Sequence, residues 1–307
     1  MDSTDHGAGE APGTRDARGR RSRRGPLVAG LAVLAALAGL TWARTLPARV
    51  QEARLLIRGI RLYYELEGKG PPLLLLHGGA GNGMQFSKQR RDFARAHQLI
   101  VPDCCAQGRT TDRPGPLTFH DMAEDMVALL DALHIRRTDV MGWSDGGVVG
   151  LDFAIHHPDR VAHLVTFGAN FSPDGLNAPD VEWNRTATAD SFGTGTRVSW
   201  TTLNPEPEHY RAAMDKILEL WRTQPRFTPA ELGSIRARTL VCVGEHDLIR
   251  PEHTAALAAA IPGAETWIVP GASHSAMIER PDLVNPRVLA FLADQPRPSL
   301  QPARGDR

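Results

Sequence analysis

The sequence predicts an α/β fold, in which a mostly parallel central sheet has helices on both faces and an inserted helical cap. Short apolar runs recur along the chain and alternate with stretches of helical periodicity. The run at 73–76 is uninterrupted and is followed by glycines, which is typical of a strand buried on both faces. The alternation breaks over one long stretch, 171–234, which is where we expect the cap.

The composition narrows the class of protein. A chain of 307 residues with 42% hydrophobic and 23% charged residues buries a substantial core, so disorder of the whole chain is excluded. The formal net charge is zero, and no basic stripe lies outside the N-terminal tail, so we expect no nucleic-acid partner. Three cysteines, Cys104, Cys105 and Cys242, are too few for a zinc site or a disulfide framework. We expect a small-molecule partner and neither metal nor cofactor, while the oligomeric state has no sequence signal.

The N-terminal region predicts membrane contact. Residues 1–26 read as a disordered leader that ends in clustered arginines, and 27–43 is an uncharged segment at the short limit of a membrane span. A basic region before an apolar stretch describes both a transmembrane anchor and a cleavable export signal. We favour the anchor, with the folded domain outside the cytoplasm, and keep export after cleavage as the alternative. The tail at 294–307 is rich in proline and is expected to be disordered.

The elements of the folded part follow from periodicity. A hairpin turning at Gly59 opens it. Further strands are expected at about 73–76, 99–101, 139–142, 164–167, 240–243 and 267–269. Helices are expected at about 85–97, 118–134, 146–157, 251–261 and 281–293.

The cap interrupts a core made of 53–170 and 235–293. Within 171–234, turn-forming residues come first and one amphipathic helix at 208–222 follows them. The cap tryptophans Trp183, Trp200 and Trp221 are candidates to line an apolar pocket, although at least one is expected to pack the cap onto the core.

A glycine-rich turn links an expected strand to an expected helix, with the sequence Gly142-Trp143-Ser144-Asp145-Gly146-Gly147. It matches the G-x-S-x-G pattern in the strand–turn–helix context that this pattern requires. Side chains two residues either side of Ser144 would collide with so tight a turn, which explains the glycines. The N-terminus of the following helix favours negative charge on a reacting oxygen. Ser144 is therefore the candidate nucleophile.

A serine hydroxyl needs a base within hydrogen-bond reach, because it is too weakly acidic to attack unaided. His274 follows the last expected strand, whereas His156, His157 and His253 fall on helices and are read as surface or capping residues. The acid that orients the imidazole is expected to be Asp247, which satisfies the chain order Ser, Asp, His. Glu245 and Asp174 are the alternatives for the acid.

The remaining predicted site residues either stabilise negative charge on the reacting oxygen or contact the substrate. Backbone N–H groups of Gly79 and Asp145 are expected to form an oxyanion hole. Asp145, Trp143 and Trp183 are candidate substrate contacts. The Asp145 carboxylate either faces the pocket, where it attracts a substrate ammonium group, or accepts hydrogen bonds from internal donors, and we favour the second interpretation.

These motifs, in this order, resemble the α/β-hydrolase superfamily over about 53–293. The stretch after Gly142 is similar to the cap-bearing esterase branch that includes valacyclovir hydrolase-like enzymes. The resemblance implies an α/β-hydrolase fold with a Ser144, Asp247, His274 triad. One departure follows the fourth strand, where relatives usually carry Arg-Gly-x-Gly and this chain has Asp103-Cys104-Cys105-Ala106-Gln107-Gly108-Arg109. It alters the support behind the site but removes no triad member.

The expected activity is hydrolysis of small or medium carboxylic esters through an acyl-Ser144 intermediate. A cofactor-free haloperoxidase or perhydrolase shares the same triad and stays open. A ligand receptor that keeps the fold without turnover is the alternative from another class, since fold alone does not imply function. Acyl and alcohol specificity have no readable motif.

Overall fold

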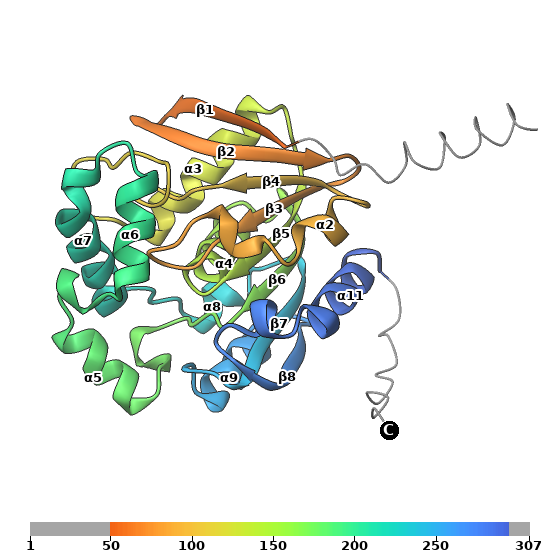
Figure 1. The fold of residues 1–307 in the computed structure, drawn as a ribbon. Helices are drawn as coiled ribbons and strands as arrows, with labels where there is room; N and C mark the ends of the chain where they lie inside the picture. Colours follow the sequence, from red (N-terminus) through yellow and green to blue (C-terminus); the bar gives the residue numbers. More distant parts are fainter. Residues whose placement is uncertain (1–49, 295–307) are drawn as a thin grey trace, which may run out of the picture. The chain divides into compact units, whose positions relative to one another are not determined.

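Eight strands form one sheet in the computed structural model, which describes residues 50–294 (Figure 1). The strands are β1 (Gln51–Ile57), β2 (Ile60–Gly68), β3 (Pro72–Leu76), β4 (Gln98–Pro102), β5 (Thr138–Trp143), β6 (Val161–Phe167), β7 (Arg238–His246) and β8 (Glu265–Ser273). Their order in the sheet is β1-β2-β4-β3-β5-β6-β7-β8. β2 pairs antiparallel with β1 and β4, and every other pairing is parallel. The predicted fold class is confirmed.

The parallel register determines where loop residues meet. β3 and β6 flank β5, and β7 lies between β6 and β8, all running in the same direction. The carboxyl ends of parallel strands lie at one edge of the sheet, and this is where ligands bind in open α/β sheets. The loops that follow β3, β5, β7 and β8 therefore meet at this edge.

Helices cover both faces of the sheet, because its central strands are apolar on both sides. α3 (Phe119–Ala132), α4 (Asp145–His156) and α9 (Pro251–Ala260) contribute to one buried apolar core. α2 (Arg90–Phe93), α10 (Ala276–Glu279) and α11 (Pro281–Leu292) contribute to the core on the other face. The helices expected near 118–134, 146–157, 251–261 and 281–293 are confirmed to within two residues at most ends.

The stretch at 85–97 differs from the single helix expected there. It contains the 3₁₀ helix η1 (Gly83–Phe86), the one-turn α2 and then a turn. The chain has to reverse here, because Gln98 already donates a backbone hydrogen bond to Pro71 as β4 begins beside β3. The requirement to enter the sheet ends the helical periodicity early.

The segment between β6 and β7 holds four α-helices where one was expected. They are α5 (Ala178–Thr186), α6 (Thr194–Leu203), α7 (Tyr210–Thr223) and α8 (Pro229–Leu232), with short 3₁₀ helices at Pro173–Gly175, Ala189–Ser191 and Pro207–His209. α5, α6 and α7 gather on one side of the fold in Figure 1. α6 was missed because its Thr and Gly residues have low helix propensity. A tertiary contact stabilises α6, since the indole of its Trp200 donates to the Ala106 carbonyl at 3.0 Å.

The expectation of a membrane anchor is corrected. Across residues 50–294, no helix is both long and apolar enough to cross a bilayer. The leader at 1–26, the apolar segment at 27–43 and the tail from 295 onward lie outside the described residues. We therefore withdraw the transmembrane segment, the membrane partner and the placement of the domain outside the cytoplasm.

Candidate active site

Ser144 lies on the turn between β5 and α4, in a backbone conformation that non-glycine residues rarely adopt (φ 54°, ψ −120°). The glycines of the motif make room for this turn. A Cβ at Gly142 would lie 2.2 Å from the Gly146 carbonyl oxygen, and a Cβ at Gly146 would lie 2.0 Å from that of Leu76. The turn therefore requires glycine at both positions, and it raises the Ser144 side chain at the edge of the sheet.

The loops after β7 and β8 bring Asp247 and His274 together. His274 Nδ1 lies 2.7 Å from Asp247 Oδ1, and the carboxylate is buried. Backbone N–H groups of Ile249 and Gly244 also donate to this carboxylate, at 3.1 and 3.2 Å. Three donors hold Asp247 in place, so the imidazole ring has a fixed partner.

The alternative acids lie elsewhere. The Glu245 carboxylate is exposed and accepts from the Gly271 backbone N–H at 2.7 Å. Asp174 contacts Arg250 through its backbone carbonyl. Neither forms a hydrogen bond with His274, so the geometry favours Asp247 over both.

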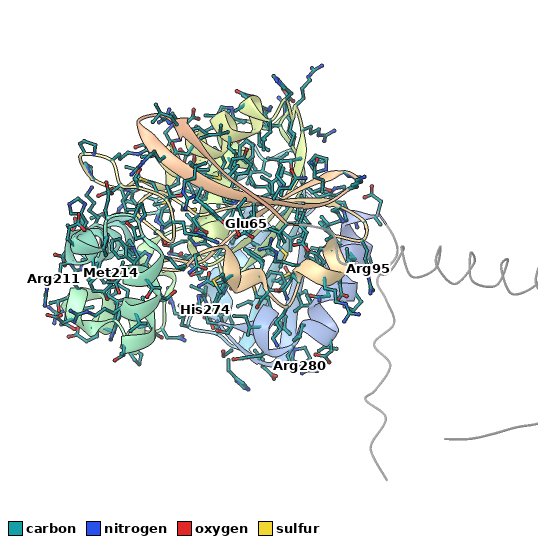
Figure 2. The ribbon with its side chains drawn as sticks, turned by 45° about the horizontal axis from the view of Figure 1, so that its top comes forward. Glu65, Arg95, Arg211, Met214, His274 and Arg280 are labelled. Atoms are coloured by element: carbon teal, nitrogen blue, oxygen red, sulfur yellow. The ribbon has the colours of Figure 1, made fainter. Side chains whose placement is uncertain are left out.

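Ser144 and His274 line one cavity of about 360 Å³. In Figure 2, His274 lies between the green cap helices and the blue C-terminal elements. The Trp143 indole donates to the His274 carbonyl at 2.8 Å and forms part of the cavity wall. Gly79 and Asp145, the expected oxyanion-hole residues, also line this cavity. Six of the seven predicted site residues line this cavity, namely Gly79, Trp143, Ser144, Asp145, Trp183 and His274. Asp247 does not line it and is connected to it through the hydrogen bond to His274.

The cap closes the cavity with aromatic rings. Trp183, Phe192 and Trp221 lie within 6.5 Å of one another, measured between ring centroids. Trp183 was predicted to line the pocket and does so, whereas Trp200 is buried against the core. Phe192 was missed, because an isolated aromatic residue in a turn-rich segment has no periodicity that would assign it to a pocket.

The Asp145 carboxylate meets the cap. Both of its oxygens lie within 2.9 Å of the Trp221 indole nitrogen, which donates to them. Asp145 also lines the cavity, so the two positions considered for its carboxylate, at the pocket and bonded to an internal donor, coexist. Burial raises the pKa of this carboxyl from 3.8 to about 6, against the opposing effects of the Trp221 hydrogen bond and the His274 charge.

The loop after β4, where the chain departs from the usual Arg-Gly-x-Gly sequence, is held in place by a different arginine. The Arg109 side chain donates to the carboxylates of Asp103 and Glu65, each at 2.7 Å. Asp103 is fully buried and also accepts from the Gly83 backbone N–H at 2.7 Å. Arg109 therefore provides a guanidinium group behind the loops of the site. Cys104 and Cys105 are buried free thiols.

Comparison with known proteins identifies the family. The model of the alpha/beta hydrolase family matches residues 73–287. The chain belongs to this family. A protein of Azorhizobium caulinodans, named provisionally as the carbamate hydrolase RutD, is 28% identical over an alignment of 253 residues that covers 76% of this chain and 95% of that protein.

Other hydrolases are similar to this chain over most of its length. The 2-hydroxy-6-oxo-6-phenylhexa-2,4-dienoate hydrolase of Burkholderia cepacia is 26% identical and covers 78% of this chain and 93% of its own length. The crystal structure of a hydrolase from Pseudomonas aeruginosa superposes with a TM-score of 0.65 at 26% identity, covering 79% of this chain and 98% of that one. The predicted superfamily is confirmed, and the protein is a hydrolase.

Gly168 offers a test of the imidazole position. It has a φ of +58°, and a Cβ there would lie 2.7 Å from the His274 ring. Gly263 has a similar φ of +68°, but nothing lies within 4 Å of a Cβ at that position. We expect Gly168→Ala to lower kcat at least ~10-fold by displacing the ring, since small misplacements of catalytic groups are costly. Gly263→Ala, which carries the same backbone strain, should retain wild-type kcat; equal losses in both variants would contradict this.

Asp145→Asn is expected to stabilise the protein at neutral pH. Below pH ~4 the carboxyl is protonated in both the folded and the unfolded chain, so burial carries no ionisation cost. Between pH ~4 and ~6 the Asp145 carboxyl loses its proton in the unfolded chain before it does so in the folded protein. The free energy of unfolding of the wild-type protein therefore falls by up to about 2–3 kcal/mol over this range, whereas that of the variant does not. Urea unfolding of both proteins across this range measures the effect. The stability difference should grow as the pH rises, and a difference independent of pH would contradict it.

Proposed function

We propose that this hydrolase cleaves carboxylic esters of small or medium size through an acyl-Ser144 intermediate. The observation that carries the proposal is the 2.7 Å hydrogen bond between His274 and buried Asp247, at the same cavity that Ser144 lines. Nucleophile, base and orienting acid recur in this relation in serine hydrolases of unrelated folds.

The roles follow from the hydrogen bonds. When His274 donates its Nδ1 proton to Asp247, Nε2 keeps the lone pair that accepts the Ser144 hydroxyl proton. The Ser144 oxygen then attacks the ester carbonyl carbon, and His274 returns the proton to the departing alcohol. Water, activated by the same imidazole, hydrolyses the acyl-enzyme in the second half of the reaction.

Backbone N–H groups stabilise the tetrahedral intermediate in this proposal. Gly79 follows β3 and Asp145 begins α4, so both N–H groups belong to elements beside the Ser144 turn. The positive end of the α4 dipole adds to the same effect. Removing one such donor in other hydrolases costs about 2.7–4 kcal/mol of transition-state stabilisation.

The cavity favours a compact substrate with an apolar part. Its volume of about 360 Å³ is near the lower limit of ordinary ligand pockets. Trp183, Phe192 and Trp221 offer aromatic surface for an alkyl or aryl group. Trp143 and Asp145 complete the substrate contacts. Relatives named for hydrolysis of a carbamate and of a dienoate support acyl chemistry at this site.

A panel of p-nitrophenyl esters tests the proposal. We expect kcat/KM for acetyl to hexanoyl esters to exceed that for dodecanoyl esters at least ~10-fold, because a cavity of this size excludes long chains. Labelling of the protein by a fluorophosphonate should accompany turnover. Amino-acid esters in the same panel test the Asp145 contact, and a preference for neutral acyl groups counts against it. Absence of ester hydrolysis together with absence of labelling would refute the proposed function.

A further inference from the structure

A cluster of three metal-ligating side chains lies away from the cavity, where α3 packs against α4. It consists of His120, Asp152 and His156. His120 is the second residue of α3, and Asp152 and His156 are four residues apart on α4, so they share one face of that helix. His156, predicted to be a surface or capping residue, is exposed. The sequence did not predict the cluster, because His120 comes from a different helix.

Both imidazoles converge on one carboxylate. Nδ1 of His120 lies 2.9 Å from Asp152 Oδ1, and Nδ1 of His156 lies 3.1 Å from the same oxygen. One ligand atom from each of the three residues lies within 4.8 Å of the others. Ligands of a tetrahedral ion with bonds of 2.0–2.1 Å are about 3.3 Å apart, so small side-chain rotations would complete a site.

The carboxylate of the cluster is buried beside the two imidazoles. The Asp152 side chain is 5% exposed. Within residues 50–294, its ion-pair partners are the two histidines alone, and neither lysine nor arginine contacts it. A cation bound between the imidazoles and this carboxylate would offset the cost of burying it.

Either nitrogen of each imidazole ring can carry the proton, so a change of tautomer frees Nδ1 for an ion. His156 Nδ1 currently lies 3.0 Å from the Asp152 backbone carbonyl as well, which indicates a proton on that nitrogen. Both histidine side chains are partly exposed, at 51% and 41%, so Nε2 can carry the proton in contact with solvent. Nδ1 then presents its lone pair.

We propose that His120, Asp152 and His156 bind a divalent transition-metal ion of the Zn²⁺ class. Two imidazole nitrogens and one carboxylate oxygen suit Zn²⁺, whereas Mg²⁺ and Ca²⁺ prefer sites made of oxygen ligands. Asp152 is eight residues along α4 from Ser144, which is roughly 12 Å of helix, so the ion takes no part in the hydrolysis. It clamps the start of α3, where Phe119 lines the cavity, to the C-terminal half of α4.

Titration of the full chain, chelator-treated and free of a histidine tag, tests the proposal. Calorimetry with ZnCl₂ should show one saturable equivalent, and Zn²⁺ at ~100-fold above its Kd should raise the Tm by roughly 5 °C. Mg²⁺ and Ca²⁺ at the same concentration should leave the Tm unchanged. Failure of wild-type protein to bind Zn²⁺ at all would overturn the proposal.

Variants locate the ion. His120→Ala, His156→Ala and the near-isosteric Asp152→Asn should each weaken Zn²⁺ binding at least ~10-fold and abolish the Tm rise, since even residues behind a ligand change affinity by that much. His209→Ala removes another exposed histidine, one on the cap beside Glu206, and should bind Zn²⁺ like wild type. Co²⁺ should give a visible absorption band that the first three variants lose, independently of their stability. Undiminished Zn²⁺ binding by a His120→Ala/His156→Ala double variant would overturn the proposal.

Discussion

Replacing Ser144 with alanine is expected to lower kcat for ester hydrolysis by about five to six orders of magnitude. In the proposed mechanism the Ser144 oxygen forms the covalent bond with the acyl group, and no other group at the cavity replaces this oxygen. Loss of the nucleophile in serine hydrolases reduces kcat to the level that binding and oxyanion stabilisation alone supply. Initial rates with p-nitrophenyl butyrate measure the loss, and fluorophosphonate labelling should disappear in parallel.

The fold should survive this substitution, because alanine is smaller and no internal hydrogen bond ends on the hydroxyl in the described part of the chain. Alanine also relaxes little of the turn, since the strain is in the backbone. Ser234→Ala, at an exposed position after α8, is the matched control and should retain both turnover and labelling. Turnover retained by Ser144→Ala would show that another group attacks the substrate.

Replacing Asp247 with asparagine is expected to lower kcat by about four orders of magnitude. Asparagine fills the same volume but offers its amide N–H or its oxygen to the imidazole in place of a full negative charge. The His274 tautomer that accepts the serine proton is then no longer favoured, and the imidazolium formed during attack is not stabilised. Initial rates across pH measure the effect, and thermal unfolding verifies that the variant is folded.

Two matched controls make this test specific. Glu245→Gln and Asp174→Asn change the acids that sequence order left as alternatives, and each should retain kcat within a few-fold of wild type. Their carboxylates are not bonded to His274, whereas Asp247 lies 2.7 Å from it. A large loss in either control, with Asp247→Asn near wild type, would show that the acid changed in that control, and not Asp247, orients His274.

Features that depend on neighbouring residues were predictable from the sequence. The glycines at 142 and 146 are required by contacts within six residues of Ser144 and with the strand beside it, so their spacing identifies the turn. Leu73–Leu76 are fully buried because an apolar run without alternation suits a strand covered on both faces. The cap was harder, because α6 has weak intrinsic helix preference and its packing against the core stabilises it.

The sequence by itself determined the α/β class, the candidate nucleophile and the order of its partners. Strand and turn patterns depend on residues close together along the chain, so they can be recognised in the sequence. The tertiary structure alone decided which acid meets His274 across 27 residues and that Trp221 bonds Asp145 across 76. It also decided that His120 reaches Asp152 across 32 residues. Such pairs are set by how the helices and loops pack on the sheet, and packing depends on the whole chain at once.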